Sequence, residues 1–312
     1  MLAVVAHRYG DPEVLELAEV PTPEPGAGEV LVQVRASGTN PVDAECRQGQ
    51  AAPWFDEGPY IWGWDISGIV VAVGPGATGF APGDAVYGMP RFPVQARGYA
   101  EYVTAPAEDL AAKPAHVSHT AAAALPLCGL TALQVLDLAG ASAGQRVLVN
   151  GASGGVGHLA VQLARARGCH VIGVAREVNH DFVRGLGADE VIDYTVTGVA
   201  DAVRDVDVVV DLAGVDSLLE TVRFGGVIAP VPGAARGAGP LEEAAARRGV
   251  RVLRHVVHPD RPALGRLAEL VERGALAAEI TRELPLEEAV LAHKLLEAGH
   301  ARGKVVLTPP TR

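Results

Sequence analysis

Over much of the first 115 residues, hydrophobic residues recur at every second position, which is the period of a β-strand. Val30, Val32 and Val34 place their side chains on one face and predict a strand over 29–38. Residues 65–89 predict two more strands joined by a Gly-Pro-Gly turn, and residues 98–106 predict another. We therefore expect the N-terminal part of the chain to form a β-rich partial barrel.

The period changes near residue 116, where a helical pattern begins. Residues 118–140 predict one helix, with Ser118 or Thr120 as its cap and Gly140 at its end. From there, apolar strands alternate with helices. The strands are expected at 146–151, 170–175, 190–194, 207–214, 225–233 and 250–257, and the helices at 154–168, 179–187 and 241–249. This alternation predicts a doubly wound parallel sheet covered on both faces, with right-handed crossovers.

The last part of the chain repeats neither pattern. Amphipathic helices are expected over 261–274 and 285–301, the second with Pro285 at its start, followed by a strand over 303–309. On pattern alone, this tail either extends the α/β region or returns to the first part of the chain.

A glycine-rich turn connects the first strand of the α/β region to the helix that follows it. Its spacing is GxxGxxG. Glycine there allows a tight bend, close approach of a pyrophosphate and close packing of the helix, while the helix N-terminus favours phosphate. The expected contacts to a dinucleotide are Gly151, Ser153, Gly154, Gly155, Val156 and Gly157. The alternative is a purely structural turn, but the strand–turn–helix–strand order favours a dinucleotide.

The end of the next strand distinguishes NADH from NADPH. Enzymes that use NAD place an acidic residue there to hold the ribose, whereas this chain has Arg176. A guanidinium suits a 2′-phosphate, and Asn179, His180 and Tyr194 are expected to add contacts. We therefore predict NADPH. The alternative is a solvated Arg176, with Glu177 on the ribose of NADH.

Two further loops follow strands at the same carboxyl edge of the predicted sheet, where ligands of open α/β sheets bind. They are Ala213-Gly214 and Val231-Pro232-Gly233. We expect both to flank the nicotinamide half of the cofactor, although their glycines are also consistent with plain turns.

Composition narrows the class of partner. The formal net charge of -11, without a Lys/Arg cluster, argues against a nucleic-acid partner. We find neither a long uncharged apolar stretch nor a signal-peptide pattern, so we expect no membrane span and a cytoplasmic protein. The three cysteines form no CxxC pair, so neither a disulfide framework nor a zinc knuckle is indicated.

Six segments spread over the whole chain resemble one family in its own order. They are residues 37–49, 63–74, 125–136, 150–157, 186–194 and 299–307. As a set they resemble the zinc-independent medium-chain dehydrogenases/reductases of the quinone oxidoreductase (zeta-crystallin) type. The resemblance implies a GroES-like catalytic domain from 1–116 and 279–312, around a Rossmann NADP-binding domain over 117–278. It also implies a homodimer that pairs through the edge of the Rossmann sheet.

The zinc alcohol dehydrogenases of the same superfamily differ at their metal ligands. Asn40 occupies the place of a zinc-ligand cysteine, and Trp64 replaces the histidine of a Gly-His-Glu segment. Cys128 lies near the place of a third ligand, but one thiol does not hold zinc, and we interpret it as a small buried residue. We predict no metal, which argues against alcohol oxidation by this chain.

The reaction that remains is hydride transfer from NADPH to an electrophile that is already activated, a quinone or an α,β-unsaturated carbonyl. Reduction of an enone leaves an enolate, which needs a hydrogen-bond donor and then a proton. We select Asn40 as the catalytic polar group and as a cofactor contact; a turn-forming Asn before Pro41 is the alternative. Asp43 is expected to anchor this loop by local hydrogen bonds. Family members often carry Tyr where this chain has Glu45, so the proton donor and the exact substrate stay open.

Further residues complete the expected pocket. Tyr60, Trp62 and Trp64 are candidates for an apolar substrate wall, with core packing as the alternative. Thr131 is expected to contact the nicotinamide amide, and Lys304 to close the cofactor cleft, unless it is a surface lysine.

Two rival functions stay open on the sequence. One is an enoyl or enone reductase that acts on a natural-product intermediate. The other is a non-catalytic NADPH-binding sensor, which an altered glycine turn would favour; the turn is intact in this chain.

Overall fold

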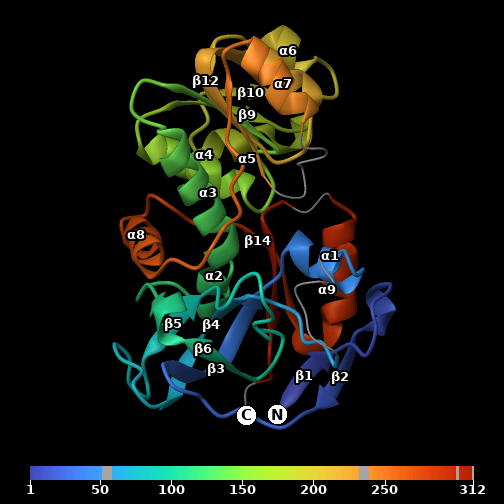
Figure 1. The fold of residues 1–312 in the computed structure, drawn as a ribbon, viewed down its shortest axis with the longest axis vertical. Coiled ribbons are helices and arrows are strands. Elements are labelled where there is room, and N and C mark those ends of the chain that lie inside the picture. The colour runs from blue at the N-terminus through green and yellow to red at the C-terminus, as the bar shows by residue number, and fades with distance from the viewer. Residues whose placement is uncertain (51–57, 232–238, 300–301, 311–312) are drawn as a thin grey trace. The chain divides into compact units, whose positions relative to one another are not determined.

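The computed structural model describes residues 1–50, 58–231, 239–299 and 302–310, which fall into two compact units (Figure 1). Unit 1 comprises Met1–Leu130 and His258–Arg312, and unit 2 comprises Thr131–Val257. Both ends of the chain therefore belong to unit 1, and unit 2 is inserted between them. In the described part of the chain, no helix combines the length and the hydropathy that a membrane crossing requires.

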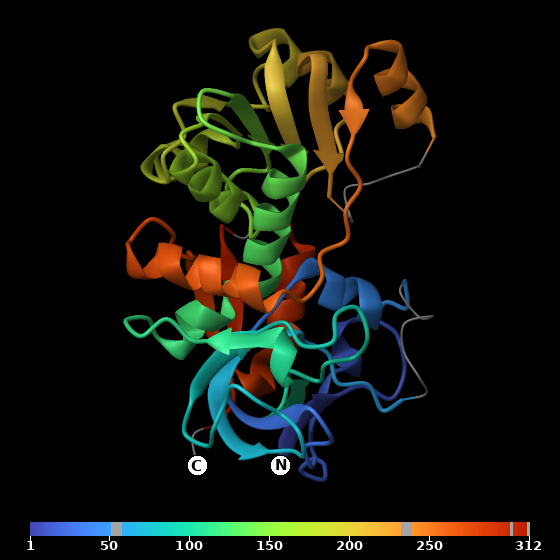
Figure 2. The ribbon, with the colours of Figure 1, turned by 60° about the vertical axis from the view of Figure 1, so that its left-hand side comes forward.

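Unit 1 contains a seven-stranded sheet with the order β14-β15-β3-β4-β5-β7, in which β6 also pairs with β3. The strands are β3 (Glu29–Gly38), β4 (Asp65–Val73), β5 (Ala85–Gly88), β6 (Tyr102–Pro106), β7 (Leu110–Ala112), β14 (Ile280–Pro285) and β15 (Lys304–Thr308). A separate antiparallel pair is formed by β1 (Leu2–Val5) and β2 (Glu16–Glu19). The strands of the larger sheet are curved (Figure 2), and buried residues from several of them form one hydrophobic cluster. The predicted β-rich part is therefore confirmed.

The side chains of β3 show why this sheet has a core. Val30, Val32 and Val34 are buried, while the residues between them are half-buried. The three valines belong to one hydrophobic cluster with Ile66 of the neighbouring β4 and Val86 of β5. The alternation predicted from the sequence is thus confirmed, because only one face of a pleated strand meets the core.

The tail returns to unit 1 and pairs with its sheet. β15 lies between β14, to which it is parallel, and β3, to which it is antiparallel. The backbone amide and the hydroxyl of Thr39 both donate to the Val305 carbonyl, at 3.0 and 2.9 Å. This pairing places Lys304, the first residue of β15, beside the loop that follows β3.

The helix predicted over 118–140 is in fact two helices. α2 (His119–Ala123) begins after Ser118, whose hydroxyl accepts from the Ala121 amide at 3.1 Å. α3 (Pro126–Ala139) follows after Ala124, the C-cap of α2, and Leu125. The prediction of one continuous helix was wrong because Pro126 disfavours helical backbone at the residue before it. α3 starts in unit 1 and ends in unit 2.

In the described part of unit 1 there are three more α-helices. They are α1 (Pro41–Arg47), α8 (Arg261–Glu272) and α9 (Ala289–Glu297). The Tyr87 hydroxyl on β5 donates to the Leu264 carbonyl in α8 at 2.6 Å, and the Arg261 guanidinium lies 4.6 Å from the centre of the Phe80 ring. These contacts tie α8 to unit 1. The second unit boundary therefore lies at 257/258, where the expectation was 278/279, and the first lies at 130/131 rather than 116/117.

Unit 2 is built on a six-stranded sheet with the order β10-β9-β8-β11-β12-β13, and every neighbouring pair is parallel. Its strands are β8 (Arg146–Asn150), β9 (His170–Val174), β10 (Glu190–Ile192), β11 (Val206–Asp211), β12 (Val222–Pro230) and β13 (Arg251–Val252). Its helices are α4 (Gly157–Ala166), α5 (His180–Gly185), α6 (Val199–Ala202) and α7 (Pro240–Arg247), besides the end of α3. Figure 2 shows helices on both sides of this sheet, and the predicted doubly wound parallel sheet is confirmed.

The strand predicted over 250–257 is much shorter than expected. Only two residues form β13. The side chains of Arg254 and His255 instead bond to Glu242 of α7 and Gln134 of α3, so the segment leaves the sheet to satisfy them.

Gly38 offers a test of how tightly β3 packs in unit 1. A Cβ atom added there would collide with the Ala123 carbonyl at the end of α2, so we expect Gly38→Ala to destabilise the protein by about 1–3 kcal/mol. The matched control is Gly265→Ala in the middle of α8, where nothing lies within 4 Å of the added atom. That substitution should stabilise by up to about 1 kcal/mol, since alanine favours the helix. Denaturant unfolding measures both; equal effects would contradict this account of the packing.

Candidate functional site

Two of the glycines in the turn between β8 and α4 are required by the fold. Gly151 has a φ of +83°, which side chains other than glycine rarely adopt. A Cβ atom at Gly157 would collide with the Gly151 carbonyl and would lie 2.9 Å from the Ala152 Cα atom. These two glycines allow the bend and the close approach of α4 to the turn.

Gly154 differs from these two, because the backbone around it does not require a glycine. An added Cβ atom would meet only the Gly151 carbonyl oxygen, at an ordinary 3.4 Å. Beside it, the amide groups of Gly155 and Val156 donate to no acceptor among the described residues. They precede the N-terminus of α4, whose dipole favours an anion. The turn therefore fits the pyrophosphate of a dinucleotide, with Gly154 leaving room for it.

The residues predicted for the adenosine end lie together at the carboxyl end of β9. Arg176 is exposed, and its Nε donates to the Tyr194 hydroxyl at 3.0 Å. Asn179 donates through Nδ2 to the Ser153 hydroxyl of the glycine turn at 3.3 Å, and His180 bonds to the Ala175 carbonyl at 3.2 Å. The terminal nitrogens of Arg176 bond to none of the described residues, so they are available to an anion such as a 2′-phosphate.

Asp211, at the end of β11, organises the next loop and was missed on the sequence. Its carboxylate accepts from the amides of Ala213, Gly214 and Val215 at 3.0–3.1 Å. It also accepts from Asn150 Nδ2 at 2.8 Å. An Asp directly before a Gly-containing loop was the available signal, since its side chain caps the amides that follow.

This capping bears on the two loops that are expected to flank the nicotinamide. The amides of Ala213 and Gly214 are already used, so any contact from these residues to a ligand uses other atoms. The Val231 amide bonds to the Asp211 carbonyl at 2.9 Å. Pro232 and Gly233 lie outside the described residues. The role of these loops stays a prediction.

In unit 1, Asn40 and Lys304 lie in one buried polar cluster with Asp65 and Cys128. The Lys304 ammonium donates to the Thr39 carbonyl at 2.7 Å and to Asn40 Oδ1. It lies 3.5 Å from Asp65 Oδ2 and 3.4 Å from Cys128 Sγ. Lys304 is only 3% exposed, so the alternative of a surface lysine is excluded.

Asp65 connects this cluster to the start of α3. Its Oδ1 accepts from the Leu127 amide at 2.7 Å, and its Oδ2 accepts from Asn40 Nδ2 at 3.0 Å. Burial raises the pKa of Asp65, an effect that the nearby Lys304 ammonium opposes. For Lys304 itself, burial lowers the pKa, but the surrounding Cys128, Asp65 and Asp43 outweigh it and the net shift is upward.

Asp43 anchors the loop that carries Asn40, as predicted. Its Oδ2 accepts from the Asn40 amide at 2.7 Å and from the Tyr99 hydroxyl at 2.8 Å. Its Oδ1 has no partner among the described residues, and burial raises the pKa of Asp43 to about 7. Sequence reasoning missed Tyr99, because nothing in the local pattern connects it to this loop.

The aromatic residues predicted as a substrate wall form part of the packed interior. Trp62 and Trp64 are each 1% exposed, and Trp64 Nε1 donates to the Val94 carbonyl at 2.8 Å. Tyr60 is half-buried and stacks on Trp62, with ring centres 5.2 Å apart. The alternative of core packing therefore applies to both tryptophans, and their contact with a substrate stays a prediction. Thr131, in α3, is 5% exposed, and its contact with a nicotinamide also stays a prediction.

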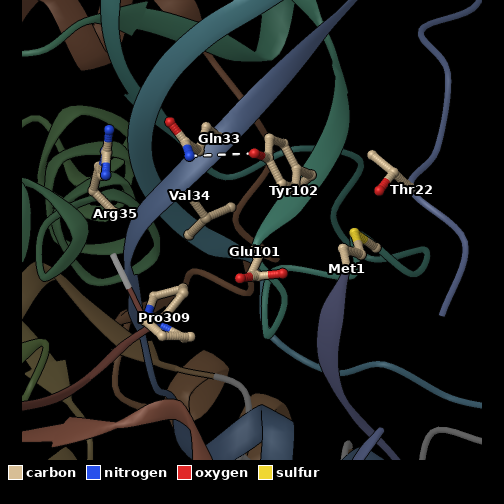
Figure 3. A pocket seen from close by; sticks show the side chains of 9 residues that line it. Met1, Thr22, Gln33, Val34, Arg35, Glu101, Tyr102 and Pro309 are labelled. Atoms are coloured by element: carbon tan, nitrogen blue, oxygen red, sulfur yellow. Dashed lines mark hydrogen bonds between the residues drawn. The ribbon is translucent and has the colours of Figure 1, made fainter. Parts of the chain in front are cut away.

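A hollow of about 220 Å³ lies elsewhere in unit 1 (Figure 3). Its lining includes Gln33, Arg35, Glu101 and Tyr102, and Gln33 Nε2 donates to the Tyr102 hydroxyl at 3.3 Å. None of the predicted site residues lines it, so it is distinct from the Asn40 cluster.

The described residues contain no group of three or more His, Cys, Asp or Glu side chains that could hold a metal ion. The Lys304 ammonium and Asn40 Oδ1 each lie 3.4 Å from Cys128 Sγ. A cationic ammonium at this position opposes the binding of a second cation. These residues therefore do not fit zinc.

Comparison with known families gives two matches. Residues 26–115 match the alcohol dehydrogenase GroES-like domain, and residues 186–307 match a domain described as zinc-binding dehydrogenase. The two matches lie in the regions where the sequence motifs resemble the same superfamily.

Individual proteins resemble the chain along nearly its whole length. A 2-methylene-furan-3-one reductase of Solanum lycopersicum is 34% identical over 96% of this chain and 77% of its own. An NADPH-dependent alkenal/one oxidoreductase of Arabidopsis thaliana is 33% identical over 99% of this chain and 80% of its own.

Solved structures of quinone oxidoreductases are also similar to this chain. The quinone oxidoreductase of Coxiella burnetii is 37% identical with a TM-score of 0.93, and the comparison covers 100% of this chain and 99% of that one. The Escherichia coli quinone oxidoreductase, solved with NADPH, is 27% identical with a TM-score of 0.89, covering 99% and 100%.

Substitutions at two glycines of the turn should separate ligand binding from folding. Gly154→Ala should leave the thermal midpoint nearly unchanged, because the added atom has room, but should weaken NADPH binding by roughly ten-fold or more by filling the space beside the free amides. Gly157→Ala is the contrasting variant and should lower the thermal midpoint. Calorimetric titration and thermal unfolding measure the two effects. Unchanged NADPH affinity in Gly154→Ala would rule out pyrophosphate binding at this turn.

Proposed function

The chain belongs to the medium-chain dehydrogenase/reductase family, within its quinone oxidoreductase type, and we propose that it transfers a hydride from NADPH to a quinone or an α,β-unsaturated carbonyl. The observation that carries the proposal is full-length similarity, above 30% identity, to reductases named for alkenals, enones and quinones. The glycine turn supports it, because there is space beside Gly154 and the neighbouring amides of Gly155 and Val156 bond to none of the described residues. The same full-length similarity argues against a non-catalytic sensor.

The residues of unit 2 would hold the cofactor, which supplies the hydride when it is bound. The turn from Gly151 to Gly157 receives the pyrophosphate through free backbone amides. The exposed Arg176, held by Tyr194, receives the 2′-phosphate. The chain thus selects and orients the nucleotide mainly through backbone amides and one guanidinium.

Unit 1 would supply polar groups for the substrate. The Asn40 side chain is fully buried in unit 1. Where a substrate reaches it, its amide N–H is a donor for the oxygen on which negative charge develops when an enone or a quinone accepts a hydride. The bond from Asp65 to the Leu127 amide joins the Asn40 cluster to the start of α3. We retain Asn40 as the catalytic polar group. Of the predicted substrate wall we retain Tyr60, because it is half-buried whereas Trp62 and Trp64 are buried.

Assembly and location are separate proposals. A homodimer rests on the family resemblance, and a cytoplasmic location rests on composition. Relatives include proteins named as chloroplastic and mitochondrial, so location varies among the proteins that this chain resembles.

The function is tested by NADPH consumption with a panel of quinones, alkenals and cyclic enones. We expect turnover with at least one of these classes, and no loss of rate after dialysis against EDTA, because the Asn40 cluster does not fit a metal. Preference for an elongated enoyl thioester over the panel would favour the natural-product alternative. No NADPH oxidation with any acceptor, by a protein that binds NADPH, would refute the proposal.

Arg176→Ala tests the choice of nucleotide. The wild-type protein should bind NADPH several-fold more tightly than NADH, and the variant should lose roughly ten-fold or more in NADPH affinity while NADH binding changes little. Arg184→Ala is the matched control, since Arg184 is an exposed arginine on α5 whose side chain pairs, among the described residues, only with its neighbour Asp181. Equal affinity of the wild-type protein for the two nucleotides would show that Arg176 does not select the phosphate.

A further inference from the structure

The Lys304 ammonium uses all its donors within unit 1. An ammonium has three N–H donors and no acceptor. Two of them meet close acceptors, the Thr39 carbonyl and Asn40 Oδ1. The third faces Asp65 Oδ2 and Cys128 Sγ, at 3.5 and 3.4 Å. No donor is left for a cofactor, so Lys304 is better explained by a role inside this cluster than by the cofactor contact predicted from the sequence.

By the family resemblance, three partners of Lys304 lie at or next to places where the zinc enzymes of the superfamily carry ligands. Asn40 occupies the place of the ligand cysteine, Asp65 follows the residue in the place of the histidine, and Cys128 lies near the third place. In this chain the ammonium lies among the side-chain atoms of all three. The cluster therefore has a centre of positive charge, supplied by a side chain.

That charge determines how the Asn40 amide is oriented. Oδ1 accepts from the ammonium, and Nδ2 donates to the Asp65 carboxylate at 3.0 Å. The opposite orientation would place the amide hydrogens against the ammonium and the oxygen against the carboxylate, which is electrostatically unfavourable. In the observed orientation, Nδ2 keeps one N–H that no described residue accepts.

We propose that Lys304 is a positioning residue that takes the place of a catalytic metal ion, holding the Asn40 amide so that its remaining N–H serves the reduction. The proposal rests on the proposed function for the reaction that Asn40 serves. It extends that function by assigning Lys304 to act through Asn40, without touching cofactor or substrate.

The test is a double-mutant cycle with Lys304→Met and Asn40→Ala. Each single variant should lower kcat roughly ten-fold or more, with NADPH affinity changed less than about two-fold. The double variant should be no slower than Asn40→Ala alone, because Lys304 acts through Asn40. Multiplying losses would overturn the proposal, and so would a Lys304→Met variant that loses NADPH affinity in place of kcat. Lys294→Met, on the exposed face of α9 where Lys294 pairs with Glu13, is the control and should match the wild type.

Removing the ammonium leaves Asp65 buried without its counter-charge, so Lys304→Met can fail to fold. The second variant is therefore Lys304→Met/Asp65→Asn, which removes both charges and should regain the thermal midpoint while kcat stays low. Recovery of kcat together with stability would show a purely structural role and refute the proposal.

A readout independent of turnover separates this proposal from the proposed function. The unfolding free energies of Lys304→Met, Asn40→Ala and the double variant should be non-additive, since the two side chains are directly bonded. Additive values would refute the pairing even in an active enzyme. Non-additive values in a protein that oxidises no NADPH would refute only the proposed function.

Discussion

The site in unit 1 depends on one interaction, the burial of the Lys304 ammonium among acceptors from separate segments of the chain. Moving a charged group out of water costs several kcal/mol, and each hydrogen bond to a charged group returns about 1.5–3 kcal/mol. The fold must therefore bring the Thr39 carbonyl, Asn40, Asp65 and Cys128 to the ammonium together. The pairing of β15 with β3 does this, because it places the start of β15 beside the loop after β3. The contacts of Lys304 with Thr39 and Asn40 thus depend on the pairing of β15 with β3.

The glycine turn of unit 2 is built differently, from residues that are close together in sequence. Its turn uses backbone amides, and the glycines that expose them lie within seven residues of one another. Two of these glycines serve the bend and the packing of α4, while Gly154 leaves room beyond what the chain itself needs. Asp211 then stabilises the neighbouring loop by accepting from three successive amides. A site of this kind needs a strand, a helix and a correct turn, and no buried charge.

Predictions from the sequence were confirmed where a structure depends on residues that are close in sequence. They were wrong where a single residue or side-chain contact ends a helix or a strand early. The alternation in β3 and the parallel sheet of unit 2 were confirmed, because burial on one or both faces leaves a periodic pattern. The helix over 118–140 was divided by Pro126, and the last strand of unit 2 was shortened by polar side chains with partners in α7 and α3. Asp65 and Asp211 were missed because each caps amides in a way that periodicity does not reveal.

The order of the residues was enough to predict the two kinds of secondary-structure pattern, the glycine turn, the position of Arg176 after β9 and the absence of the expected zinc-ligand residues at positions 40 and 64. The contacts of Lys304 became visible only in the folded chain. Its closest side-chain partner, Asn40, is 264 residues away along the chain, and no local pattern connects them. The physical reason is that the energy of a buried charge depends on the groups that fold around it, whereas a turn or an amphipathic strand depends on neighbours in sequence.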